Sequence, residues 1–405
     1  MGRWPRIGET VLTDKLWVEW ASRQTTGNRS DEDIIRTFQS KERFFALLVS
    51  SLADAQRADM IDIADIAVEM LEQGSPPERV AKCVIEWAEN DPPGGRRMPF
   101  SIIDVAADQP GALQMRLADS DAPPLFMTRR VEATYNHTLF LPPVLEDLYH
   151  GHLLRLCQLR LQDGDHLAMV SEGYVRAKGG AGRWVWKDIA TYTRRLSATG
   201  CSAAQLLDAM FSTYRRRALS ASAGEGGAQE RKPISVVAMY IRPVRTVTVW
   251  TGPPLDPAQD EEALGRLMAE AGARVICGDT TAQIAARHLD ANLELEPRPA
   301  HGWIEVPPLQ TLAGVDLVTE GLVTMDKTLE RMADAVQVND LPRTQDGATR
   351  LARILLAADC VHFIVGLAVN PHQIDESGEP LRRGLVEKIA EHLKARAKIV
   401  SIAYL

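Results

Sequence analysis

The sequence of 405 residues has no long hydrophobic run. Its longest apolar stretches, such as Phe44–Val49 and Phe363–Val369, are far shorter than the roughly 20 residues that a membrane-spanning helix needs. The amino-terminal stretch MGRWPRIGETV lacks the apolar core of a secretory signal, and Arg6 breaks the myristoylation pattern. We therefore expect neither a membrane protein nor a secreted one.

Cysteines are also few, and the net charge is negative rather than positive. The five cysteines contain no C-x-x-C pair, and each lies in or near an apolar run, which favours buried, reduced thiols in the cytoplasm. The 46 Lys+Arg against 54 Asp+Glu give a formal net charge of −8, so we expect no nucleic-acid partner. No G-x-G-x-x-G loop, Walker A motif or G-x-S-x-G elbow occurs, which excludes the common nucleotide-binding loops and the hydrolase elbow.

The residues that are present indicate a folded protein of two or three domains, with 45% hydrophobic and 25% charged side chains. In residues 1–242 the pattern predicts strand pairs and two helix pairs, which is typical of an α+β domain. In residues 243–405 short strands alternate with helices, which predicts a carboxyl-terminal α/β domain with a mostly parallel sheet. We place the domain boundary between these two ranges.

Apolar runs bounded by turn residues predict the individual elements. In the first domain the predicted strands are 16–20, 44–49, 100–105, 113–117, 125–128, 153–161, 166–170 and 234–241. In the second domain they are 246–250, 274–277, 315–318, 362–365 and 399–404. The predicted helices are 58–72, 76–89, 187–198, 203–219, 258–271, 281–289, 324–335, 346–358 and 381–397. Ser202 and Gln205 have the spacing of a capping box at the start of a helix.

Several motifs occur in an order that resembles one family. They are GDHLAMVSEGYVRAKGG, RWVWKDI, PISVVAMYIRP, TVWTGPPLDP, VICGDTTAQIAARHL, GVDLVTEGLVTMDKTLE and VHFIVGLAVNP. Together they resemble the metal-dependent PPM phosphatases of the stage II sporulation protein E family, in the subgroup with an extra carboxyl-terminal domain. The resemblance covers nearly the whole chain and is strongest from residue 163 onward. It implies two packed antiparallel sheets flanked by helix pairs, and hydrolysis of phosphoserine or phosphothreonine by water that Mn²⁺ or Mg²⁺ activates.

The resemblance also places the family's metal ligands on residues of this chain. Two of these positions keep a carboxylate, namely Asp14 and Glu172. The bridging aspartate falls on Ser50, the neighbouring glycine on Ser51, and the last Asp-Asp pair on Lys232-Pro233. Two divalent cations need several negatively charged oxygen ligands, and a lysine beside them costs Coulomb energy. A shifted alignment could recruit Asp54, but Leu52 and Arg57-Ala58 match the family frame without a shift.

These positions predict a signalling protein of the phosphatase family whose metal site is degenerate and which acts by binding a phosphoprotein or a regulatory partner. One alternative is an active metal-dependent phosphatase that uses Asp14, Glu172 and Asp54 with Mn²⁺ or Mg²⁺. Another alternative is a small-ligand-binding α/β module on a phosphatase-derived scaffold.

The second domain suggests where such a ligand would lie. Small and polar residues follow the predicted strands, and ligands of open parallel sheets bind at the carboxyl ends of strands. The candidate residues are Gly278, Asp279, Thr280, Thr281, Glu320, Gly321, Gly366 and Asn370. Asp279 adds a negative charge that disfavours phosphate. The alternative interpretation is that Thr280 is a helix cap and the glycines form turns.

His150 and His152 have the spacing of one strand face, with Glu146 close in sequence. A polar strand face explains them best, and a two-histidine metal pair is the alternative.

Overall fold

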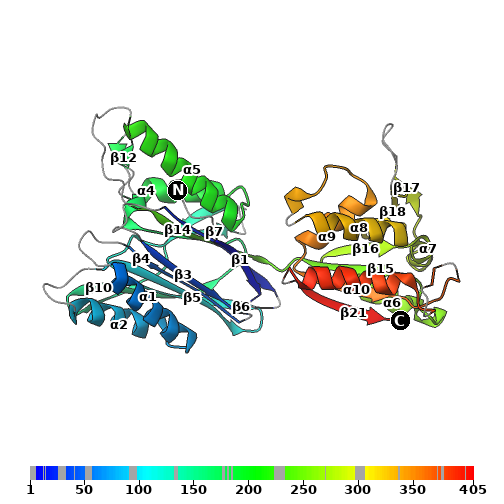
Figure 1. Ribbon diagram of the computed structural model, residues 1–405, viewed down its shortest axis with the longest axis horizontal. Helices are drawn as coiled ribbons and strands as arrows, with labels where there is room; N and C mark the ends of the chain where they lie inside the picture. The colour runs from blue at the N-terminus through cyan, green and yellow to red at the C-terminus, as the bar shows by residue number, and fades with distance from the viewer. Residues whose placement is uncertain are drawn as a thin grey trace. The chain divides into compact units, whose positions relative to one another are not determined.

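The structure of the protein is a computed structural model of α+β class, which confirms the coarse fold prediction. It describes every residue outside 1–5, 12, 14, 26–32, 41, 51–56, 91–97, 132–135, 176–177, 180–181, 184–185, 223–232, 270, 297–305, 336–337, 372, 375–377 and 397. The chain divides into two compact units, Met1–Pro243 and Val244–Leu405 (Figure 1). No helix of the described residues is long and apolar enough to span a membrane.

The first unit contains two six-stranded antiparallel sheets. The first sheet has the order β1 (Arg6–Val11), β2 (Leu16–Gln24), β14 (Ser235–Pro243), β11 (His166–Val170), β7 (Phe126–Val131), β8 (Asn136–Phe140). The second sheet has the order β3 (Ile34–Gln39), β4 (Arg43–Val49), β5 (Phe100–Gln109), β6 (Ala112–Ser120), β10 (His152–Leu161), β9 (Leu145–Tyr149). A short helix and a short hairpin follow β11, namely α3 (Glu172–Val175), β12 (Lys178–Gly179) and β13 (Gly182–Arg183).

A helix pair covers the outer face of each of these sheets. Helices α1 (Arg57–Glu72) and α2 (Pro77–Asn90) pack on the second sheet, and α4 (Trp186–Ser197) and α5 (Ala203–Ser222) pack on the first (Figure 1). Strand β4 is apolar from Phe44 to Val49 because Phe44 and Leu48 enter the core between the sheets while Phe45 and Leu47 pack against α1 and α2. The unit therefore has one core between its sheets and one under each helix pair.

The second unit has a single seven-stranded sheet with helices on both faces. Its order is β17 (Glu294–Leu295), β18 (Gln310–Leu312), β19 (Val315–Thr319), β16 (Ala273–Cys277), β15 (Thr246–Thr251), β20 (Cys360–Val365), β21 (Ile399–Tyr404). The five strands from β19 to β21 are parallel, and β17 and β18 add antiparallel pairs. Helices α6 (Asp260–Ala269) and α7 (Asp279–His288) pack on one face. Helices α8 (Leu322–Asp334), α9 (Gly347–Ala357) and α10 (Leu381–Lys394) pack on the other (Figure 1).

Local sequence signals explain several element boundaries. The capping box at Ser202 is confirmed, since Gln205 N–H donates to Ser202 Oγ and Ser202 N–H donates to Gln205 Oε1, at 3.2 and 2.9 Å. The strands that the pattern does not predict include β1, β3, β8 and β9, which are the four edge strands of the two antiparallel sheets. Edge strands bury less surface, so their sequences carry a weaker apolar alternation.

Candidate functional site

Each sheet of the first unit becomes polar at one end of the face that it turns toward the sandwich core. By strand alternation, the polar residues continue the rows of apolar residues that form the core between the sheets. In the first sheet they are Ser22, Gln24, Ser171 and Ser235, and in the second sheet Ser50, Ser101 and Asp119. All of them are buried, so folding removes these polar groups from water. Their hydrogen bonds must offset the free energy of solvation that is lost.

Three of the positions that the resemblance maps to a metal site are described. Ser50 follows β4, is buried, and donates its backbone N–H to the Pro99 carbonyl at 2.9 Å. Glu172 is the half-buried first residue of α3, and Pro233 is buried just before β14. Ser171 and Ser235 link the last two, because Ser171 N–H donates to Ser235 O at 3.0 Å and Ser235 N–H donates to Ser171 Oγ at 2.9 Å. Glu172 and Pro233 therefore lie at neighbouring strand ends.

The remaining mapped positions, Asp14, Ser51 and Lys232, lie outside the described residues, as does the alternative ligand Asp54. In the part of the chain that the structure describes, no group of three His, Cys, Asp or Glu side chains is placed to hold a metal ion. The described donors at the mapped positions are one carboxylate and one hydroxyl, and a proline side chain donates nothing. Such a set does not fit two divalent cations, which prefer several carboxylate oxygens.

Asp119 is the charged group at the polar end of the second sheet. Arg155 lies opposite it on β10 and donates from Nε to Asp119 Oδ1 at 2.6 Å and from Nη2 to the Ala122 carbonyl at 2.7 Å. Burial raises the pKa of Asp119 to about 6, although the Arg155 guanidinium acts in the opposite direction. This ion pair neutralises the polar end of the second sheet, whose other named residues, Ser50 and Ser101, are uncharged.

The second unit gathers the other sequence-predicted residues at the carboxyl edge of its parallel strands. Strands β19, β16, β15 and β20 are consecutive in the sheet and point the same way, so the residues that follow them lie along one edge. Those residues include Gly278 and Asp279 after β16, Glu320 and Gly321 after β19, and Gly366 after β20. Asn370 lies farther along the exposed segment after β20, where its carbonyl accepts Gln373 N–H at 2.8 Å.

The starts of α7 and α8 bring two backbone segments close together at this edge. Gly278 and Gly321 occupy the N-cap positions, and neither glycine has a side chain that could cap its helix. A Cβ added at Gly321 would lie 3.5 Å from the Gly278 Cα, and Gly278 has φ +132°. The cap of α7 is therefore Gly278 rather than Thr280, and Thr280 and Thr281 belong to the first turn of the helix.

Two buried hydroxyl groups lie beside these helix starts without hydrogen-bond partners among the described residues, namely Thr281 Oγ1 and Thr324 Oγ1. Thr281 Oγ1 would lie 3.0 Å from a Cβ at Gly278, so it lies next to the start of α7. Thr324 is fully buried in the first turn of α8. A buried hydroxyl without a partner loses solvation and gains nothing in return, so a bound polar group would satisfy both.

Carboxylates also lie at this edge. Glu320 accepts the Thr324 N–H at 3.3 Å through Oε2, and the exposed Asp279 accepts Gln310 Nε2 at 3.4 Å. These two carboxylates interact favourably with the positive ends of the α7 and α8 helix dipoles. Their negative charge therefore disfavours an anion at the N-termini of these helices. The beginnings of α7 and α8 therefore favour a ligand with hydroxyl or amine groups.

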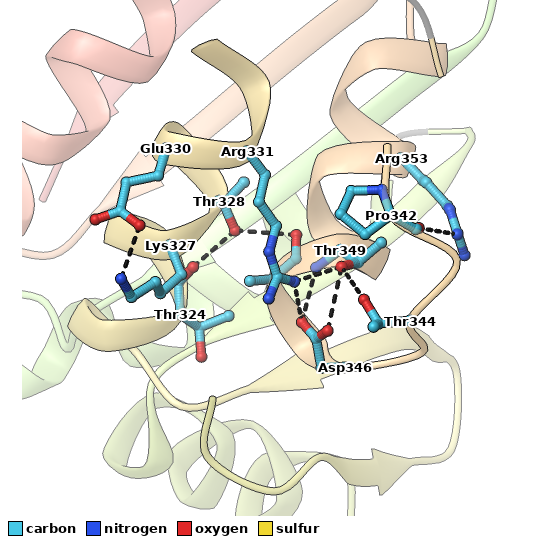
Figure 2. A network of polar contacts seen from close by, with 11 residues as sticks. Thr324, Lys327, Thr328, Glu330, Arg331, Pro342, Thr344, Asp346, Thr349 and Arg353 are labelled. Carbon is cyan, nitrogen blue, oxygen red and sulfur yellow. Dashed lines mark hydrogen bonds and ion pairs between the residues drawn. The ribbon is translucent and has the colours of Figure 1, made fainter. Parts of the chain in front are cut away.

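A polar network holds α8 against α9 next to this edge. Figure 2 shows Arg331 of α8 reaching Asp346 and Thr349 at the start of α9, with Thr344 bonded to Thr349. Asp346 caps α9 by accepting the Thr349 N–H at 3.0 Å. Burial alone would raise the pKa of Asp346, but the Thr349 N–H, Arg331 and Thr344 outweigh it and lower this pKa to about 2.

Replacing Asp346 by Ala is expected to destabilise the protein by about 1–2 kcal/mol, because both the cap and the Arg331 contact are lost. The folded pKa of Asp346 lies below its ordinary value of 3.8, so its stabilisation is present above pH 3.8 and is lost as the pH falls toward 2. Urea unfolding at neutral pH measures the effect, with Asp326→Ala on the exposed face of α8 as the control. An equal loss in both variants would contradict the role of the network.

The histidine pair does not form a strand face. His150 lies in the turn before β10 with φ +51°, while His152 begins β10. The carboxylates beside them are Glu89 of α2, with His150 Nδ1 at 2.5 Å and His152 Nε2 at 3.9 Å, and Asp121, whose Oδ2 lies 3.6 Å from His152 Nδ1, rather than Glu146. The metal-pair alternative receives no support from the described residues.

No protein-family model matches the sequence, and no curated protein matches it. Solved structures that are similar include the RsbU and RsbW domains of a Mycobacterium tuberculosis protein, at 14% identity and a TM-score of 0.41 over 71% of each chain. The PP2C phosphatase domain of SpoIIE from Bacillus subtilis, with a fragment of its regulatory domain, is 13% identical with a TM-score of 0.43, over 57% of this chain and 65% of that one. RsbX in complex with magnesium is 9% identical with a TM-score of 0.39, over 59% and 100%.

Proposed function

We propose that the chain is a signalling protein with a phosphatase-like first unit that acts mainly by binding a phosphoprotein or a regulatory protein. The observation that carries this proposal is Ser50. It is buried at the end of β4, in the row of residues that faces the sandwich core, where the sequence resemblance puts the aspartate that would bridge two metal ions. A neutral hydroxyl cannot balance the charge of two dications at that point.

The neighbouring positions support the same proposal. Pro233 offers no ligand atom in its side chain where the resemblance puts an acidic pair, and Glu172 has one methylene more than the aspartate that it replaces. Since two-metal hydrolysis depends on a clamp that holds both ions, a partial ligand set is expected to lower metal affinity and rate together. The fold then remains available as a recognition surface while the chemistry is weakened.

We expect the full chain to release no phosphate above background from a phosphoserine peptide in the presence of Mn²⁺ or Mg²⁺. Calorimetric titration with Mn²⁺ is expected to show weak or no binding, because the carboxylates that would hold it are reduced in number. Glu172→Ala is the test variant and Glu146→Ala, on the exposed edge strand β9, is the matched control.

Mn²⁺-dependent phosphate release that Glu172→Ala abolishes and Glu146→Ala preserves would overturn this proposal. That outcome would support the active metal-dependent phosphatase with an altered metal site, which uses Asp14, Glu172 and Asp54.

A second function, binding of a small ligand by the second unit, is favoured by a separate observation. The buried hydroxyl groups of Thr281 and Thr324 have no partner among the described residues and lie at the carboxyl edge of parallel strands. Open parallel sheets bind ligands at this edge because strand ends and helix starts meet there. The two functions are compatible, since a ligand of the second unit could regulate the first.

A further inference from the structure

Arg382 is a buried cation without an acidic partner in the described part of the chain. It lies in the first turn of α10, is 8% exposed, and donates from Nη1 to the carbonyls of Gly366 and Ala368 at 3.0 Å each. Burial lowers the pKa of Arg382, and no carboxylate of the described residues acts against this effect. Buried charges are normally paired because transfer out of water is costly, so this arrangement is incomplete by itself.

The next residue, Arg383, is neutralised by carboxylates, as charged side chains commonly are. The side chain of Arg383 is 40% exposed and pairs with Glu379, just before α10, at 3.0 Å and with Glu387 of α10 at 3.2 Å. The acids near the start of α10 that the structure describes therefore neutralise Arg383 and leave the buried Arg382. Adjacent arginines in one helical turn thus have opposite electrostatic environments.

Helix α10 adds positive potential at the same place. Pro380 is its N-cap and provides no side-chain cap, and the first turn contains no acidic residue. The helix dipole favours an anion at this end and disfavours a cation, so Arg382 stands where it weakens the free helix. A bound anion would reverse that effect and would pair with the guanidinium. The N–H groups of Leu381 and Arg383 in this turn already donate to the carbonyls of Gln373 and Pro380, at 2.9 Å each, so the guanidinium is the main donor that the anion would meet.

The location is the one where open α/β sheets bind ligands. From β15 the chain continues to β16 and β19 on one side, and it then returns to β20 and β21 on the other. Arg382 contacts the segment after β20, next to the carboxyl end of β15, where the strand order reverses. A Cβ at Gly252 (φ +78°) would lie 2.4 Å from Arg382 Nη1, so glycine is required for the guanidinium to occupy this place.

We propose that Arg382 binds the oxyanion group, phosphate or carboxylate, of a small ligand of the second unit; this inference rests on the proposed ligand-binding function. The two carbonyls use Nη1 only, which leaves the Nε–H and Nη2–H donors on the other edge of the guanidinium. That edge matches two oxygens of a phosphate or a carboxylate. Asp279 and Glu320 follow β16 and β19 at the same edge of the sheet. In this proposal they bind the uncharged or basic groups of the ligand, which point away from Arg382.

The test uses the full chain with inorganic phosphate and with succinate as separate probes, and chloride at matched ionic strength as the reference. Calorimetric titration and thermal unfolding are expected to show binding of at least one probe that chloride does not reproduce. Arg382→Gln is expected to weaken that binding by about tenfold or more, since charge-assisted hydrogen bonds are lost. Arg383→Gln, the matched control, is expected to leave it unchanged within about twofold.

The variant Arg382→Lys keeps the positive charge but removes the two parallel N–H donors of the guanidinium, so it distinguishes the two contributions. It also provides a result if Arg382→Gln fails to fold. It is expected to bind the probe more weakly than the wild-type chain, because an ammonium cannot offer two parallel donors. Equal affinity in the wild-type chain and in either Arg382 variant, or no probe effect beyond that of chloride, would show that Arg382 is only a structural clamp on the two carbonyls.

A thermal-shift screen of uncharged metabolites against the full chain separates the two proposals. Stabilisation by an uncharged ligand together with no response to either anion would overturn the inference about Arg382 and support ligand binding by the second unit. No response to any compound would count against both.

Discussion

Replacing Arg155 by Met is expected to destabilise the first unit by about 3–5 kcal/mol near neutral pH, because Asp119 would remain buried without its cation. Asp119 lies at the polar end of the second sheet and is 2% exposed. Methionine keeps an unbranched apolar stem and removes the guanidinium, so the loss reports on the charge together with the hydrogen bond to the Ala122 carbonyl.

The effect of Arg155→Met is expected to depend strongly on pH. The folded pKa of Asp119, about 6, lies above its ordinary value of 3.8. The folded state therefore binds this proton more tightly, and the contribution is favourable below pH 3.8 and is lost as the pH rises through about 6. Removing Arg155 raises the folded pKa further, so the penalty is expected to be largest above pH 7 and to fade toward pH 4.

Urea unfolding of the wild-type chain and the variant, at matched pH values between about 4 and 8, measures this difference. The double variant Arg155→Met with Asp119→Asn is the control, and it is expected to lose the pH dependence because no buried carboxylate remains. A penalty for Arg155→Met that stays constant from pH 4 to pH 8 would show that Arg155 acts only through packing.

Replacing Glu19 by Ala is expected to cost about 3–5 kcal/mol at neutral pH, since the buried Arg242 then loses its ion pair with Glu19. Arg242 of β14 is 1% exposed and donates from Nε to Glu19 Oε1 of β2 at 2.5 Å. Its guanidinium also lies over the Trp17 ring, 5.5 Å from the centroid. The pair therefore joins β2 to β14, which are neighbours in the first sheet.

Chemical denaturation measures the cost, and the double variant Glu19→Leu with Arg242→Met tests its origin. A buried ion pair that is replaced on both sides by apolar groups of similar size is often no less stable. The double variant is thus expected to regain most of the stability that Glu19→Ala loses. If the double variant is as unstable as the single one, the loss comes from packing or strand pairing rather than from an uncompensated charge.

Much of the secondary structure could be predicted from sequence because burial leaves a local signal. The run Phe44–Val49 is apolar throughout since both faces of β4 are covered, and residues Ser202 and Gln205 identify the start of α5. Edge strands are the exception. Strand β9, with the sequence LEDLY, is exposed along most of its length, so its existence depends on pairing with β10 rather than on its own pattern.

The candidate sites were predictable only in part. The glycines and threonines after β16 and β19 stand out in the sequence, and the parallel sheet brings Gly278 and Gly321 together. Arg382 was missed, although two adjacent arginines at the start of a helix oppose the helix dipole and could have been noticed. Which of the two arginines is buried follows from the packing of α10 on the sheet, and that depends on residues distant in sequence.

The absence of any long hydrophobic run was decided by the sequence itself, and no described helix is able to span a membrane. The α+β class, the central strands and the helices were likewise determined by local periodicity, because each element buries its own apolar face. Only the tertiary structure decided the edge strands, the Asp119–Arg155 and Glu19–Arg242 pairs and the position of Arg382. These features depend on partners far apart along the chain, and the energy of a charge is set by what surrounds it after folding.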